Sequence, residues 1–145
     1  MLSFNLEEEE EHYFRKGGLM KTKILVVDDE WAMQELLKNA LSLSGFDVVI
    51  AGNDVEFREQ AFLQKPDAII LDLMLGDKDG AQAYSRLLTQ GLDSNIPVVF
   101  LSALVEDRPP TLPRSDRKYA LIGKPFDTEA LVSQIHDLVG HAHRA

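Results

Sequence analysis

The stretch ILVVDDE, residues 24–30, passes from four aliphatic residues directly into three carboxylates. Three further runs share its apolar half, at residues 48–51, 68–71 and 98–101, and almost no polar residue interrupts them. Continuous apolar runs of this length are typical of strands that are buried on both faces of a parallel sheet. The stretch therefore predicts a buried strand that ends in an acidic cluster.

Helical patterns separate the predicted strands. Residues 31–44 carry apolar side chains at helical spacing and are followed by a glycine, which commonly ends a helix. Asp54 is placed to cap a second helix, Gly80 precedes a third, and Asp127 is placed to cap the last. Strands that alternate with helices form a parallel sheet with helices on both faces. We therefore expect a doubly wound α/β fold of five parallel strands, the fifth at residues 119–123.

Prolines interrupt the region where a fourth helix is due. The segment EDRPPTLPRSDR, residues 106–117, contains Pro109, Pro110 and Pro113. A proline in a helix interior removes a donor, clashes with the preceding turn and costs about 3 kcal/mol. We predict an irregular fourth helix, and leave open whether residues 108–113 form a plain surface loop or a remodelled face that binds a partner.

Composition and charge exclude several classes of protein. At 145 residues, 45% hydrophobic and 27% charged, the chain has the size and composition of one globular domain. Its net charge of -9 argues against direct binding to nucleic acid, because that binding depends on Lys and Arg. The absence of cysteine excludes disulfides and thiol chemistry, and no apolar run reaches the ~20 residues of a membrane helix. We expect a cytoplasmic protein with no membrane contact.

The chain divides into a folded part and two short ends. Residues 1–20 include the acidic run Glu7 to Glu11 and are predicted to form a disordered tail, since an export signal would be basic and then apolar. Residues 21–140 form the predicted domain, and residues 141–145 a terminal tail. Met20 directly precedes the first strand and is an alternative start of the natural protein.

Polar side chains follow four of the predicted strands at the points where they end. Asp28 and Asp29 follow the first strand, Asp72 the third, Ser102 the fourth and Lys124 the fifth. A single Asp in such a place is often only a helix cap. Because the carboxyl ends of parallel strands meet at one edge of the sheet, however, we expect all five residues to lie close together. The set therefore indicates a functional site.

The chemistry of this set points to phosphoryl transfer. Clustered carboxylates repel one another unless a cation or protons balance them, and Mg²⁺ prefers a few carboxylate oxygens together with phosphate oxygens. Asp28, Asp29 and Asp72 therefore predict a Mg²⁺ site that a phosphoryl group completes. Asp72 can act as the nucleophile toward phosphorus, while Ser102 and Lys124 can bind phosphoryl oxygens.

These motifs resemble those of the response regulator receiver family over residues 21–140. The acidic pair lies in ILVVDDE, the phosphoacceptor Asp72 in IILDLML, Ser102 in VVFLSA and Lys124 in GKPF. The resemblance implies a flavodoxin-like (βα)5 fold and a receiver domain rather than an enzyme in the usual sense. It also implies phosphorylation by a histidine kinase or phosphotransfer protein, a downstream protein target, and homodimers, which are common in the family.

The resemblance assigns further roles by position. Met74 is expected to offer its backbone carbonyl to the metal, Ala103 to leave room for the phosphoryl group, and the bond before Pro125 to be cis. Leu121 stands where the family usually has an aromatic switch residue. Tyr119 would point to the same side of the strand and is the alternative switch candidate.

Three other functions fit the residues less well. A degenerate receiver that binds proteins independently of phosphorylation is favoured by the missing aromatic residue and the prolines, but opposed by the intact acidic, Ser and Lys set. A phosphohydrolase of the haloacid-dehalogenase type would need a D-x-D motif, which VVDDEW lacks. A dinucleotide-binding protein would need a glycine-rich loop after the first strand.

Overall fold

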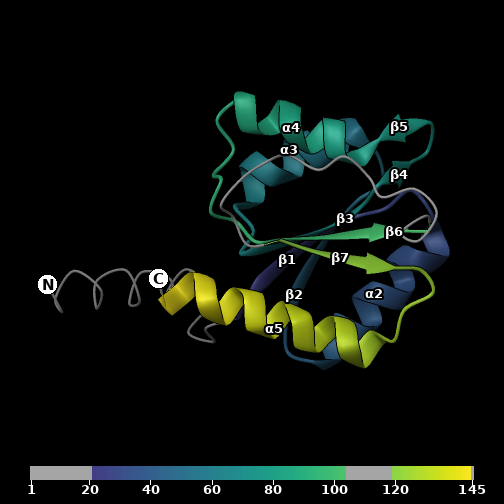
Figure 1. The fold of residues 1–145 in the computed structure, drawn as a ribbon, viewed down its shortest axis with the longest axis vertical. Coiled ribbons are helices and arrows are strands. Elements are labelled where there is room, and N and C mark those ends of the chain that lie inside the picture. The colour runs from purple at the N-terminus through teal and green to yellow at the C-terminus, as the bar shows by residue number, and fades with distance from the viewer. Residues whose placement is uncertain (1–20, 104–118, 145) are drawn as a thin grey trace, which may run out of the picture.

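Strands and helices alternate along the chain (Figure 1). The computed structural model describes residues 21–103 and 119–144, with the backbone alone for Tyr119 and residues 141–144. The five long strands are β1 (Lys23–Val27), β2 (Asp47–Ala51), β3 (Ala68–Asp72), β6 (Val98–Ser102) and β7 (Tyr119–Gly123). The helices are α2 (Trp31–Leu43), α3 (Asp54–Gln64), α4 (Gly80–Thr89) and α5 (Thr128–Arg144). A short hairpin of β4 (Met74–Leu75) and β5 (Lys78–Asp79) stands between β3 and α4.

The long strands form one parallel sheet in the order β2-β1-β3-β6-β7. This is the doubly wound, flavodoxin-like order that was predicted. β2 is added on one side of β1 and the later strands on the other, so the order of strands reverses between β1 and β3. The residues of β3 and β6 are buried throughout, as their continuous apolar sequences require, whereas the edge strand β2 is only partly buried. Ligand sites in such sheets lie at the carboxyl ends of the strands beside the reversal.

Two apolar layers cover the two faces of the sheet. Alternate residues of each strand point to opposite faces, so that Leu25 and Val27 pack with α3 and α4 while Ile24 and Val26 pack with α2 and α5. Figure 1 shows the same division, with α3 and α4 on one side of the sheet and α2 and α5 on the other. The core thus holds the sheet rigidly, and the strand ends can carry polar residues.

The cap of α3 differs from the prediction. Asn53, and not Asp54, is the capping residue, because the Asn53 side chain accepts a hydrogen bond of 2.8 Å from the Glu56 N–H. Asp54 is already the first helical residue. Asn and Asp cap helices about equally well, so their order along the chain could not distinguish them.

The last helix was predicted to begin after Asp127, in a domain that ends at residue 140. Asp127 caps α5 as expected, accepting a 3.1 Å hydrogen bond from the Glu129 N–H, and α5 continues to Arg144, past the boundary we expected at residue 140. The predicted irregular fourth helix and the acidic tail fall on residues 104–118 and 1–20, outside the described residues. Within the described parts, no helix combines the length and the apolar character that crossing a membrane would need.

Candidate functional site

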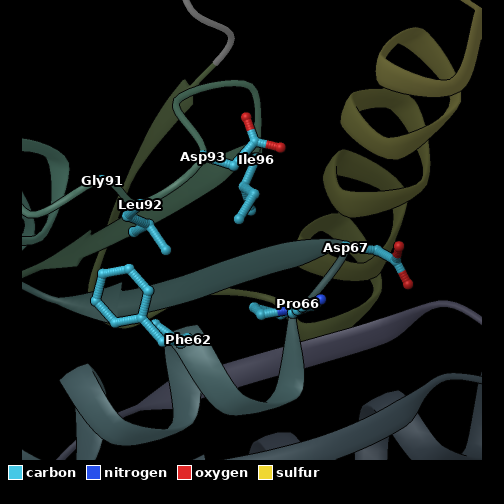
Figure 2. Close-up of a pocket in the computed structure, with 9 residues that line it drawn as sticks. Phe62, Pro66, Asp67, Gly91, Leu92, Asp93 and Ile96 are labelled. Atoms are coloured by element: carbon cyan, nitrogen blue, oxygen red, sulfur yellow. The ribbon is translucent and has the colours of Figure 1, made fainter.

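A pocket lies at the amino ends of the strands, at the edge of the sheet opposite to the acidic residues. Phe62, Leu92 and Ile96 surround it, together with Pro66 (Figure 2). The carboxylates nearby, including that of Asp67, point away from this space (Figure 2). A ligand site normally has a few polar groups that converge on the ligand. The carboxylates of this pocket do not converge on its space, so the opposite edge of the sheet is the candidate site.

Strands β1 and β3 bring two buried carboxylates to the carboxyl edge. Val27 pairs with Leu71 across these strands, and the residue after each one is an aspartate. Asp28 is 1% exposed and Asp72 is 4% exposed. Together with the exposed Asp29, they offer carboxylate oxygens that all lie within 4.8 Å of one another. The predicted acidic cluster is therefore present in space as well as in sequence.

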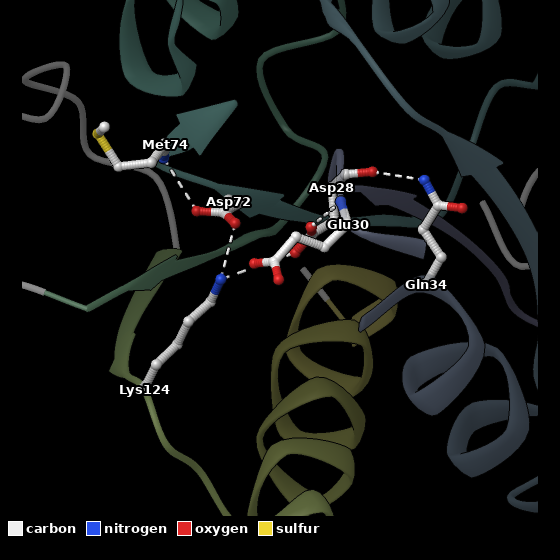
Figure 3. Close-up of polar contacts among 6 residues, drawn as sticks. All are labelled: Asp28, Glu30, Gln34, Asp72, Met74 and Lys124. Carbon is white, nitrogen blue, oxygen red and sulfur yellow. Dashed lines mark hydrogen bonds and ion pairs between the residues drawn. The ribbon is translucent and has the colours of Figure 1, made fainter. Parts of the chain in front are cut away.

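The end of β7 adds a lysine to this cluster. The Lys124 Nζ donates a 2.7 Å hydrogen bond to Asp72 Oδ2 and lies 3.8 Å from Asp28 Oδ2 (Figure 3). Its backbone N–H donates to the Ser102 carbonyl at 2.8 Å, which ties the end of β7 to the end of β6. The peptide bond between Lys124 and Pro125 is cis, as the resemblance implied.

Asp28 is the least well balanced group of the site. Its Oδ1 accepts a 2.9 Å hydrogen bond from the Glu30 N–H, whereas its buried Oδ2 accepts none from the described residues. Burial raises the pKa of Asp28 to about 6 and the nearby Asp72 adds to the rise, although the Glu30 N–H and Lys124 oppose it. A buried carboxylate oxygen without a hydrogen bond is the kind of atom that a cation would satisfy.

Lys124 balances only part of the negative charge. Burial lowers the pKa of its ammonium, but the hydrogen bond to Asp72 and the charges of Asp72 and Asp28 outweigh burial and raise the pKa above 10.5. The lysine is therefore charged at neutral pH, yet it contacts only two carboxylates, those of Asp72 and Asp28, of a cluster of three. Oxygen donors with excess negative charge suit a hard divalent cation, so these residues fit Mg²⁺.

The hairpin of β4 and β5 was not predicted and shapes the turn after Asp72. The Met74 N–H donates a 2.9 Å hydrogen bond to Asp72 Oδ1, and the Gly80 N–H donates to the Leu73 carbonyl at 2.9 Å. A Cβ on Gly80 would overlap the backbone carbonyl oxygen of Asp72. Gly80 is also the first residue of α4 and does not merely precede it. In the sequence, the only sign of this close approach was a glycine eight residues after Asp72.

The other predicted site residues occupy less decisive places. Ser102 is buried at the end of β6 and Ala103 follows it exposed, so both stand at the correct edge. Leu121 is partly buried and packs on the layer that contains Phe100. The side chain of Tyr119 lies outside the described residues, so the switch candidates stay predictions.

One residue of the site was missed by sequence reasoning. The Gln34 side chain, on the first turn of α2, donates a 2.7 Å hydrogen bond from Nε2 to the backbone carbonyl of Asp28 (Figure 3). A glutamine near the start of an amphipathic helix is ordinary in sequence, and nothing in the pattern signals such a contact.

Comparison with known proteins agrees with this geometry. Residues 24–136 match the family model of the response regulator receiver domain. Response regulator MprA of Mycobacterium ulcerans is 34% identical over 120 residues, which cover 83% of this chain and 51% of that protein. The chain thus spans about half the length of the curated relatives it matches.

Solved structures of receiver domains are similar as well. The receiver domain of Francisella response regulator 1452 has a TM-score of 0.70 and 25% identity, covering 83% of this chain and 98% of that one. The N-terminal domain of a response regulator/sensory box/GGDEF 3-domain protein from Carboxydothermus hydrogenoformans has a TM-score of 0.69 and 28% identity, covering 83% and 95%.

Proposed function

We propose, since this chain belongs to the response regulator receiver domain family, that Asp72 is its phosphoacceptor. Response regulators take phosphoryl groups from histidine kinases and signal to downstream targets. The observation that carries the proposal is the buried Asp72 carboxylate, bonded to Lys124 at 2.7 Å within a cluster of three carboxylates. The donor would be a histidine kinase or phosphotransfer protein, and the output a contact with another protein.

The contacts of Asp72 suit a nucleophile. Met74 holds Oδ1 and Lys124 holds Oδ2, so the carboxylate is oriented before a donor arrives. In the proposed step an Asp72 oxygen bonds to phosphorus, the bond from phosphorus to the donor nitrogen breaks, and its electron pair leaves with the donor. Lys124 is then free to turn its charge to a phosphoryl oxygen, because the esterified carboxylate has lost its own charge.

Two neighbours complete the proposed phosphoryl site. Ser102 stands at the end of the strand beside β3, where its hydroxyl can donate to a phosphoryl oxygen. Ala103 follows it and leaves space because its side chain is small. The positions of both residues beside Asp72 support these roles.

Asp28, Asp29, Asp72 and the Met74 backbone carbonyl would hold Mg²⁺. When bound, the ion supplies positive charge that offsets the carboxylates and the phosphoryl oxygens. The Asp28 Oδ2 that accepts no hydrogen bond from the described residues supports this assignment, as does the raised pKa of Asp28.

Intact mass tests the proposal directly. The protein is incubated with acetyl phosphate and Mg²⁺, and we expect the mass of one phosphoryl group to be added. Asp72→Asn and an EDTA-treated sample should add none, while Asp67→Asn, a matched change at the opposite edge of the sheet, should behave like wild type. A phosphoryl group that persists in Asp72→Asn would refute the assignment. No addition under any condition would favour a receiver that binds partners independently of phosphorylation.

A further inference from the structure

We infer that Gln34 is a positioning residue that aligns Asp29 with the two buried aspartates. This inference rests on the proposed function, because it gives Gln34 a part in the same metal site. Its starting point is the 2.7 Å hydrogen bond from Gln34 Nε2 to the Asp28 carbonyl, which joins helix α2 to the turn that carries the acidic residues (Figure 3).

The hydrogen bond acts on Asp29 through the peptide unit. The Asp28 carbonyl belongs to the planar group that joins Asp28 to Asp29, so a bond that holds the carbonyl also sets the direction in which Asp29 leaves that plane. Asp29 is exposed, and core packing therefore cannot hold its side chain. Its carboxylate nevertheless lies within 4.8 Å of those of Asp28 and Asp72. Gln34 supplies the constraint that burial does not.

Asp28 itself is held from three directions. Its N–H donates to the Ala51 carbonyl at 3.1 Å, its Oδ1 accepts from the Glu30 N–H at 2.9 Å, and its carbonyl accepts from Gln34. The atom that receives no hydrogen bond from the described residues is Oδ2, which lies 3.8 Å from the Lys124 ammonium. The three contacts therefore orient Asp28 so that its unbonded oxygen is available to a cation.

The Gln34 side chain starts from a hydrogen-bonded helical turn and lies beside Gly52. Its backbone N–H donates to the Glu30 carbonyl at 3.0 Å in the first turn of α2. A Cβ on Gly52 would stand only 3.3 Å from Gln34 Nε2 and 3.4 Å from Glu56 Oε1. Gly52 therefore leaves the space that the amide occupies, and Gly52→Ala is a second way to disturb the same contact without changing Asp28, Asp29 or Asp72.

A Mg²⁺ titration of the full chain tests the inference. Trp31, the single tryptophan, adjoins the acidic turn and reports the binding by its fluorescence. Gln34→Met keeps the length of the side chain but removes the donor, and we expect the Kd for Mg²⁺ to rise about three- to tenfold, the worth of one hydrogen bond. Gly52→Ala should raise it less. Gln82→Met, an exposed glutamine in the first turn of α4, is the matched control and should leave the Kd unchanged.

Two readouts separate positioning from general stability. In acetyl phosphate reactions the half-saturating Mg²⁺ concentration of Gln34→Met should rise, while the rate at saturating Mg²⁺ stays within about twofold of wild type. Hydrogen exchange at the Asp29 and Glu30 amides of the metal-free variant should also be faster. A Kd equal to that of wild type, or a rate that stays low at saturating Mg²⁺, would overturn the inference.

The titration does not depend on phosphoryl transfer. If wild type binds Mg²⁺ but gains no phosphoryl group, the proposed function fails, and the Kd of Gln34→Met still decides the role of Gln34. If wild type shows no response to Mg²⁺, the inference about Gln34 is overturned.

Discussion

Two lysines stand at opposite edges of the same sheet in unlike surroundings. At the amino edge, Lys23 Nζ donates to the Gln64 carbonyl at 3.3 Å and to its Oε1 at 3.1 Å. The Lys23 N–H donates to Asp67 Oδ2 at 2.8 Å, and the Asp67 N–H returns a 2.8 Å bond to the Lys23 carbonyl. At the carboxyl edge, Lys124 contacts Asp72 and Asp28 of a cluster of three carboxylates, and the buried Oδ2 of Asp28 accepts no hydrogen bond from a described residue.

The difference shows how one fold separates structure from function. At the amino edge, the Lys23 ammonium donates to neutral oxygens and the Asp67 carboxylate accepts from a backbone N–H, so both charged groups have hydrogen-bond partners. The carboxyl edge is left with excess negative charge, which lowers stability in the absence of a cation, and perturbed charged groups of this kind cluster at functional sites. The predictions below test whether the two edges differ in this way.

Removing each lysine in turn gives the largest expected contrast. Lys124→Met should lower the free energy of unfolding of the metal-free protein by about 4 kcal/mol, because buried carboxylates lose their nearest cation. Lys23→Met should lower it by only about 1 kcal/mol, since it loses hydrogen bonds to neutral oxygens. Urea denaturation in EDTA measures both values, and equal losses would remove the distinction between the edges.

The pH dependence of stability comes next. Because the pKa of Asp28 is raised from 3.8 to about 6, the folded state binds this proton more tightly than the unfolded state. The stability that it contributes is complete below pH ~4 and is lost as the pH rises through ~6, a difference of about 3 kcal/mol. Urea denaturation of the metal-free protein against pH should show this loss, and Asp28→Asn should abolish it.

Mg²⁺ provides the complementary check on this dependence. A bound cation favours the ionised form of Asp28, so saturating Mg²⁺ should flatten the same part of the pH profile. Asp67→Asn, at the balanced edge, should keep the dependence. A profile of Asp28→Asn that overlays wild type in EDTA would show that another group is responsible.

The close contact between Gly80 and the Asp72 backbone should contribute a smaller change in the free energy of unfolding. Gly80→Ala should lower the free energy of unfolding by about 2 kcal/mol, because its Cβ would overlap the Asp72 carbonyl oxygen. Gly140→Ala, in α5 with nothing within 4 Å of its Cβ, should instead raise it by about 0.5 kcal/mol. Thermal unfolding of the two variants measures both signs, and a neutral Gly80→Ala would contradict the close approach.

A smaller loss than at Gly80 is expected at Asp67. Asp67→Asn keeps an acceptor for the Lys23 N–H but removes its charge, so the free energy of unfolding should fall by about 1 kcal/mol. Asp28→Asn at neutral pH in EDTA should instead raise the free energy of unfolding, because it removes a poorly solvated charge. Urea denaturation under one set of conditions compares them, and a gain in stability for Asp67→Asn would mean that the amino edge is also unbalanced.

Local patterns were enough to predict most of the fold. The apolar run before Asp28 lies where its sequence placed it, since burial on both faces demands continuous apolar residues. The strand from Tyr119 to Gly123 also lies where it was predicted, although its described side chains are only partly buried. The same patterns could not choose between Asn53 and Asp54 as a cap, because both side chains accept the same hydrogen bond. They also gave no sign of the short hairpin that follows Asp72.

The sequence by itself determined the strands and helices, their order along the chain and the polar residues that follow the strands, because each of these depends on residues that are near one another in the chain. The parallel sheet, with those polar residues at one edge, followed from the general rule for alternating strands and helices. Only the tertiary structure decided which atoms meet. Lys124 reaches Asp72 across 52 residues, and Gln34 turns back to the Asp28 carbonyl from the next helix. Such contacts depend on distances between elements after packing, and a one-dimensional pattern does not contain those distances.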